Sequence, residues 1–183
     1  MNFYEFMCYY EYSQIIETMR AVFVSVFFCI CFSVSAQIRP VAASTADFAS
    51  AEGVWKGSLT YLDYTSGKPF TMPANINLKV AYGERIILSY EYPKEPKANG
   101  NDTLIISKNG LQIDGAKITA REILEDGAIQ IITDRDGVDG NDNKKAILRH
   151  LYVIGKTRFQ STKQVKFEGT DTWILRNEYL FSR

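Results

Sequence analysis

The sequence contains one histidine, His150, and this limits the chemistry that the chain could perform. His150 follows Arg149 within the run 145–154, which is otherwise mostly apolar. A single histidine rules out a metal site built from several imidazoles. An imidazole beside a guanidinium could instead hold the polar group of a ligand, or act with a carboxylate as an acid or base.

Four carboxylates and two glycines lie close together in the segment 134–143. The carboxylates belong to Asp134, Asp136, Asp139 and Asp142. Oxygen-rich loops with glycine are typical of calcium sites, although this spacing is not that of an EF-hand. Asp and Gly are also the ordinary residues of turns, so a solvated hairpin loop is the favoured interpretation. No nucleophile elbow, phosphate loop or dinucleotide fingerprint occurs, and we expect no catalytic residue set and no cofactor.

Short β-strands are the elements that must position these residues. Apolar and polar residues alternate over 54–64, 74–82 and 85–92, and further short runs separated by turn residues continue to 181. We expect 156–161 and 164–169 to form the two arms of a hairpin. The pattern predicts an all-β domain over 53–183, a single antiparallel up-and-down β-barrel of about 8–10 strands, because closure protects both edges of a meander.

The first strand opens with Gly53-Val54-Trp55. A Gly-x-Trp at this place resembles the calycins, the lipocalin-like barrels. The resemblance implies that Trp55 plugs the closed end of the barrel and that an arginine of the last strand lies across its indole, a role for which Arg176 is the candidate. Helix-poor members, such as nitrobindin-like and avidin-like barrels, fit best, since the turn after the first strand leaves no room for the two helices of fatty-acid-binding proteins.

Barrels of this size are either filled by side chains or hold one small ligand. We expect a non-catalytic barrel that binds a small, mostly apolar or amphipathic molecule, contacted by Arg149, His150, Tyr90 and Tyr92. One alternative is a filled barrel that binds another protein through its outer face or through the loops 93–101 and 134–143. Less favoured are an envelope enzyme that uses His150 with Arg149 and a carboxylate, and the haem ligation by His150 that the resemblance to nitrobindin-like barrels implies.

Residues 1–36 have the features of an over-extended gene start followed by a signal peptide. An apolar run covers 21–34, Met19-Arg20 supplies a start and a positive charge, and Val34-Ser35-Ala36 predicts cleavage after Ala36. The true start would then be Met19 rather than Met1. A membrane anchor with a short tail is the alternative interpretation. We expect 37–52 to be a flexible leader, or a short helix over one barrel mouth, and the protein to be secreted or periplasmic.

Cleavage after Ala36 would leave 147 residues without cysteine, because Cys8, Cys29 and Cys31 all precede the cut. That length suffices for one domain with a sizeable core. The remaining 20 Lys+Arg and 18 Asp+Glu nearly balance, which argues against nucleic acid as a partner. We expect no membrane span in the mature chain.

Overall fold

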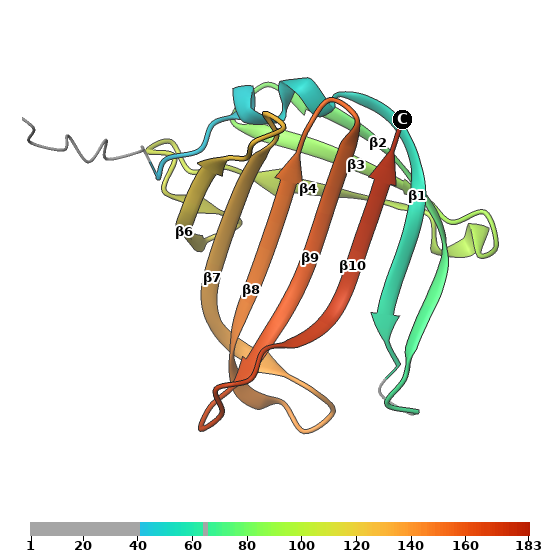
Figure 1. The fold of residues 1–183 in the computed structure, drawn as a ribbon, viewed down its shortest axis with the longest axis vertical. Coiled ribbons are helices and arrows are strands. Elements are labelled where there is room, and N and C mark those ends of the chain that lie inside the picture. The colour runs from blue at the N-terminus through green and yellow to red at the C-terminus, as the bar shows by residue number, and fades with distance from the viewer. Residues whose placement is uncertain (1–40, 64–65) are drawn as a thin grey trace, which may run out of the picture. The chain divides into compact units, whose positions relative to one another are not determined.

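The computed structural model describes residues 41–63 and 66–183, and the predicted gene start, signal peptide and cleavage site lie outside them. Figure 1 shows a barrel-like meander of strands with little helix. In chain order the elements are the 3₁₀ helix η1 (Thr45–Ala51), β1 (Gly53–Leu62), β2 (Pro69–Ala81), β3 (Arg85–Glu91), the 3₁₀ helix η2 (Pro96–Ala98), β4 (Gly100–Ile105), β5 (Gln112–Ile113), β6 (Ala116–Ile123), β7 (Ile129–Asp139), β8 (Lys144–Ile154), β9 (Arg158–Phe167) and β10 (Ile174–Ser182).

The ten strands form one antiparallel sheet in the order β4-β3-β2-β1-β10-β9-β8-β7-β6-β5. β1 pairs with β10, so the first and last strands lie in the middle of the sheet. Its two edges, β4 and β5, meet through an isolated bridge between Ile106 and Ile113. The sheet is therefore a nearly closed up-and-down barrel, as the alternation of apolar and polar residues predicted.

The alternation along β1 determines which side chains face the barrel interior. Trp55 is fully buried, and Gly57, two residues later, lies on the same face. A Cβ at position 57 would lie 1.9 Å from the carbonyl oxygen of Leu180 on β10. Only glycine therefore permits β1 and β10 to approach this closely in the middle of the sheet.

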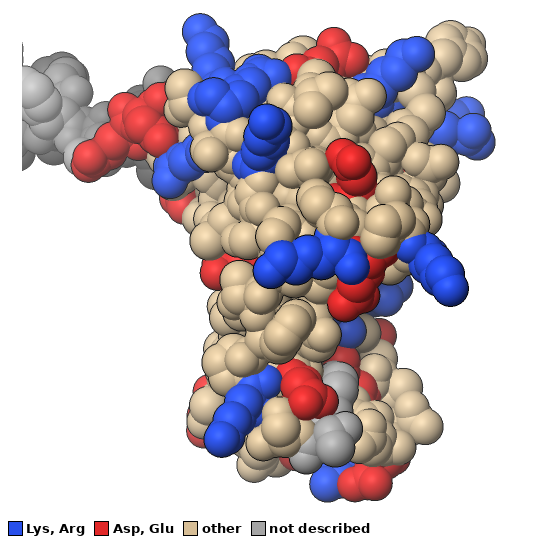
Figure 2. Space-filling model, turned by 90° about the vertical axis from the view of Figure 1, so that its right-hand side faces the viewer, with Lys and Arg blue, Asp and Glu red and all other residues tan. Residues whose placement is uncertain are grey.

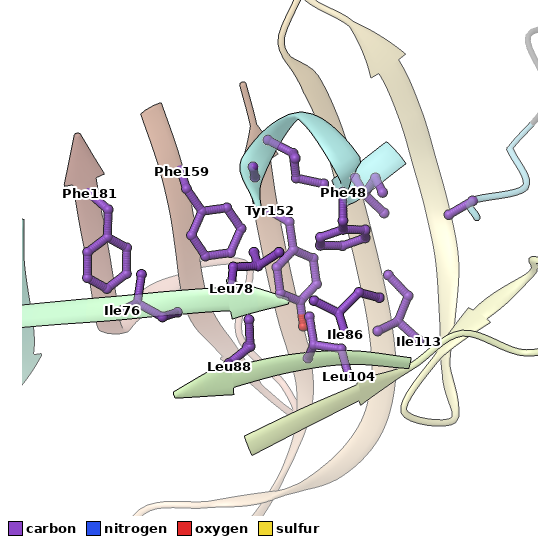
Figure 3. Packing of buried hydrophobic residues seen from close by; sticks show 14 of the residues in the cluster. Phe48, Ile76, Leu78, Ile86, Leu88, Leu104, Ile113, Tyr152, Phe159 and Phe181 are labelled. Carbon is purple, nitrogen blue, oxygen red and sulfur yellow. The ribbon is translucent and has the colours of Figure 1, made fainter. Parts of the chain in front are cut away.

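The apolar core fills the barrel beneath η1, as Figure 3 shows. Phe48 of η1 is fully buried and packs edge to face on Tyr152 of β8, with ring centroids 6.4 Å apart. Asp47 fixes the helix from the side, because its carboxylate accepts two hydrogen bonds from Arg121 of β6. Of the two expectations for this segment, a flexible leader or a short helix over one barrel mouth, residues 45–51 follow the second, since they form a helix that seals this end of the barrel.

Two expectations about the strands are wrong. Residues 158–167 form one strand, β9, and not the two arms of a hairpin. Lys163, which falls between the two expected arms, lies within this strand, and its ammonium is held by Asp139 of β7. The segment 134–143 is a loop only over 140–143, since β7 continues to Asp139 and β8 begins at Lys144.

Charged side chains of both signs are interspersed on the face of the molecule that Figure 2 shows. Surfaces of this kind do not attract a strongly charged polymer by their net field. Among the residues described, no helix is long and apolar enough to cross a membrane.

Candidate ligand-binding site

A pocket of about 490 Å³ occupies the part of the barrel interior below the apolar core. Inward-facing side chains of β3, β7, β8, β9 and β10 line it, and most of them are polar. They include Tyr90, Thr133, His150, Tyr152, Ser161 and Tyr179. The volume is within the usual range for small-molecule sites.

Three tyrosines form one wall of the pocket. The rings of Tyr90 and Tyr92 stack at an interplanar angle of 8°, and the Tyr179 ring lies 5.0 Å from that of Tyr90. The hydroxyls of Tyr92 and Tyr179 hydrogen-bond to each other at 2.8 Å. Burial is the main reason that the pKa of Tyr90 and that of Tyr179 are raised, so both phenols stay protonated at neutral pH.

His150 and Tyr152 form another part of the pocket wall, on β8. Their rings are nearly parallel, at 13° with centroids 6.3 Å apart. Burial, and then the nearby cations Lys163 and Arg135, lower the pKa of His150 to about 4. The imidazole is therefore neutral at pH 7 and can both donate and accept a hydrogen bond.

The pocket reaches the surface where its lining residues are exposed. The exposed lining residues Asp102, Asp114 and Arg135 lie at this opening. Each carboxylate accepts one backbone hydrogen bond through Oδ1, from Thr103 for Asp102 and from Ile105 for Asp114. Partial burial, followed by the charge of Asp102, raises the pKa of Asp114.

Three of the four predicted ligand contacts, Tyr90, Tyr92 and His150, line this pocket together. Arg149 does not, because successive residues of a strand face opposite sides and its neighbour His150 faces inward. The Arg149 guanidinium binds Asp134 through two hydrogen bonds of 2.8 Å and lies 4.1 Å from the centre of the Trp173 ring. The prediction that Arg149 contacts an interior ligand is therefore wrong.

The arginine that lies across Trp55 is Arg183 and not Arg176. The Arg183 guanidinium is 4.0 Å from the centre of the indole. It also donates hydrogen bonds to the carbonyls of Ser50 and Glu52 at the end of η1. The Trp55 indole in turn donates to the Ala51 carbonyl at 2.8 Å, so one cluster closes this end of the barrel.

Arg176 is instead buried toward the other end of the barrel, where a bulge in β10 turns its side chain inward. The register between β10 and β9 shifts from Leu175 to Asn177, and Arg176 lies at that shift. Its Nε is 2.8 Å from Asp139, whose second oxygen accepts a hydrogen bond from Lys163 at 2.9 Å. Gly53, the third residue predicted for closure, lies beside the Arg183 side chain and has a φ of 110°, which favours glycine.

The weak calcium candidate at Asp134, Asp136, Asp139 and Asp142 does not assemble. Asp134 is bound by Arg149, Asp139 by Lys163 and Arg176, and Asp142 by Lys144 at 3.3 Å. Alternation along β7 also directs Asp139 to the opposite face from Asp134 and Asp136. Over 41–63 and 66–183, no group of three or more His, Cys, Asp or Glu side chains could hold a metal ion.

The pocket does not fit a haem, the group that the alternative use of His150 would require. A haem is a large, mostly apolar macrocycle that needs a matching apolar pocket. This pocket is lined by tyrosine hydroxyls, Thr133 and Ser161, and Asp102, Asp114 and Arg135 lie at its opening. The interior hydroxyls of Tyr90 and Tyr152, covered by an apolar macrocycle, would lose their hydration without gaining partners.

Several residues of the site were not predicted from the sequence. Tyr152 and Tyr179 lie on expected strands, and the same alternation that selects His150 and Tyr90 would have selected them. The position of the opening depends on the tertiary arrangement of the strands, which the local alternation of apolar and polar residues does not predict. A second hollow of about 730 Å³, lined by residues such as Gly137, Ala146 and Phe167 at the ends of β7–β9, contains none of the predicted contacts.

Fold and pocket together define the class: a nearly closed antiparallel β-barrel with a polar interior pocket. No protein-family model matches the chain, and no curated protein matches it. Eleven chains of solved structures match it, among them the crystal structure of Rv2717c from M. tuberculosis. That match has 12% sequence identity and a TM-score of 0.44, and it covers 80% of this chain and 99% of that one.

Proposed function

We propose that the protein is an exported, lipocalin-like barrel that binds a small hydrogen-bonding molecule in the pocket of about 490 Å³, without catalysis. The observation that carries the proposal is the set of interior polar groups. Among the hydrogen bonds of the described residues, none involves the side chains of His150 or Ser161 or the hydroxyls of Tyr90 and Tyr152. Polar groups inside a protein need partners, and a ligand could supply several at once.

These polar groups change the expected character of the ligand. A mostly apolar molecule would bury the hydroxyls of Tyr90 and Tyr152 and the imidazole of His150 without hydrogen bonds, and each buried polar group left unpaired costs about 1–3 kcal/mol. A molecule with several donors and acceptors avoids that cost, while the rings of the lining residues still pack on its apolar parts. The ligand that we propose is therefore polar or amphipathic.

Binding without catalysis is supported by the arrangement around His150. Arg149, the partner expected in an enzyme, lies on the opposite face of β8 and is bound to Asp134. The pocket also supports ligand binding over a filled barrel that acts only through its outer surface. Export is supported by the apolar run 21–34 and by the small residues before the predicted cleavage point after Ala36.

Native mass spectrometry of the protein, purified without detergent from an exporting host, tests the proposal. We expect a mass excess over the denatured protein, carried by a small polar or amphipathic molecule. The denatured mass also tests cleavage after Ala36. The double variant Tyr90→Phe/Tyr152→Phe removes both interior hydroxyls and should lower the fraction of the protein that carries the molecule. Tyr82→Phe is the matched control, because Tyr82 is fully exposed.

Two results would contradict this function. If the wild type and the double variant bind equal amounts of the molecule, the ligand does not use the interior hydroxyls. If neither native spectra from several hosts nor a screen of polar metabolites shows a bound molecule, the barrel acts through its outer surface instead.

A further inference from the structure

The opening of the pocket carries charges of both signs that form no ion pair with one another. Asp102, Asp114 and Arg135 all line it, yet among the described residues none of the three has an ion-pair partner within 4.0 Å. The other charges that face the barrel interior are paired, as Asp139 is with Lys163. The three charges at the opening therefore remain available to a ligand.

The hydroxyl of Tyr152 belongs to the same pocket lining as these three charges. Tyr152 is only 5% exposed, and Figure 3 shows its hydroxyl pointing away from η1. No hydrogen bond to this hydroxyl is present within 41–63 and 66–183. Burial, and then the charges of Asp114 and Asp102, raise the pKa of Tyr152, while Arg135 opposes them. Asp102, Asp114, Arg135 and Tyr152 thus line one pocket together.

We infer that the ligand is a small aromatic zwitterion, a molecule in which an ammonium and a carboxylate lie close together beside an aromatic ring. This inference rests on the proposed function, since it assigns a chemical class to the ligand of the same pocket. The ammonium is held by Asp102 and Asp114, and the carboxylate by Arg135, which can bind it through two parallel hydrogen bonds.

The aromatic group of the ligand lies deeper, among the rings of the lining residues. Tyr90 and Tyr179 approach to 5.0 Å on one side, and His150 stacks on Tyr152 on another. Rings in such surroundings pack in offset or edge-to-face geometry. The Tyr152 hydroxyl and the neutral His150 then hydrogen-bond to the charged groups of the ligand near the opening.

A ligand with a single charge satisfies only part of this site. A simple amine would gain the two carboxylates but would bring its charge near the Arg135 guanidinium. A simple carboxylate would gain Arg135 but would be repelled by Asp102 and Asp114. Opposite charges close together on one molecule match the arrangement of the protein charges, and charge complementarity of this kind determines specificity more than total affinity.

Three compounds that share one phenyl ring test the inference: L-phenylalanine, phenethylamine and 3-phenylpropionate. Binding to the purified full-length or naturally processed protein is measured by isothermal titration calorimetry at low ionic strength. We expect phenylalanine to bind at least about tenfold more tightly than either singly charged compound, because each analogue loses one charged contact. Asp114→Asn should remove its advantage over 3-phenylpropionate, and Arg135→Gln its advantage over phenethylamine.

Asp171→Asn is the matched control, because Asp171 is an exposed aspartate outside the pocket. It should leave all three affinities unchanged. The inference is overturned if either singly charged compound binds as tightly as phenylalanine, or if none of the three binds at millimolar concentration. Since Asp114 and Arg135 are exposed, their substitution should not prevent folding. A co-purifying molecule of another class would overturn this inference while leaving the proposed function intact.

Discussion

The substitution Arg183→Gln tests how the end of the barrel near η1 is held closed. It removes the guanidinium from the Trp55 ring, 4.0 Å away, and deletes hydrogen bonds to the carbonyls of Ser50, Glu52 and Lys156. A cation on an indole face contributes about 0.5–1 kcal/mol at an exposed site. Each hydrogen bond adds roughly 0.5–1.5 kcal/mol, and the exposure of Arg183 places these three toward the low end.

The expected loss in the free energy of unfolding is therefore about 2–3 kcal/mol. For a domain of this size that corresponds to a fall in Tm of roughly 5–10 °C. Urea denaturation followed by tryptophan fluorescence is the appropriate assay, because the perturbed indole is itself a reporter. Arg183→Lys should recover part of the loss, since lysine keeps the charge but not the planar fork of donors.

The control for this experiment is Arg158→Gln. Arg158 forms an ion pair of 2.8 Å with Asp126, but both side chains are about half exposed, at 47% and 53%. Such a surface pair contributes less than about 1 kcal/mol. If Arg183→Gln were no more destabilising than Arg158→Gln, the guanidinium on Trp55 would not be what closes the barrel.

Three other substitutions test the core and the interior charges. Trp55→Ala should cost about 3–5 kcal/mol in urea denaturation, as expected for a buried aromatic, and an unchanged Tm would exclude a closing role. Since the pKa of His150 falls from 6.5 to about 4 on folding, stability should be lost as pH falls from 6.5 toward 4. His150→Gln should flatten that part of the stability curve by roughly 2–3 kcal/mol, and an unchanged curve would contradict the shift. Asp139→Asn removes the carboxylate beside the buried Arg176 guanidinium and should cost about 3–5 kcal/mol, whereas Asp142→Asn at an exposed pair should cost less than about 1 kcal/mol. Equal losses for these two aspartates would show that the charge near Arg176 is solvated.

The period-two pattern predicted the barrel and many of its inward faces, because the alternation of a strand is a local property of the sequence. It could not choose between the faces of β8, so both Arg149 and His150 were assigned to the ligand. That choice depends on Asp134 and Trp173, which contact Arg149 across the outer face. Only the assembled sheet brings these three residues together.

The remaining errors come from interactions between distant strands. The break expected after residue 161 is absent, and Lys163 is held within β9 by Asp139, which is 24 residues earlier in the chain. Arg176 was assigned to Trp55 from its place on the last strand, whereas a bulge in β10 directs its side chain to Asp139. Bulges and buried ion pairs depend on tertiary contacts that a single sequence does not reveal.

The strand order also constrains how the chain folds. Among the described strands, every pairing joins two strands that are consecutive in the sequence, apart from the pairing of β1 with β10. The hairpins can therefore form early, since their loop-closure entropy is small, while the pairing of β1 with β10 must join segments more than a hundred residues apart. We expect the pairing of β1 with β10 to limit the folding rate, and the contact of Gly57 with the Leu180 backbone to be formed already in the transition state.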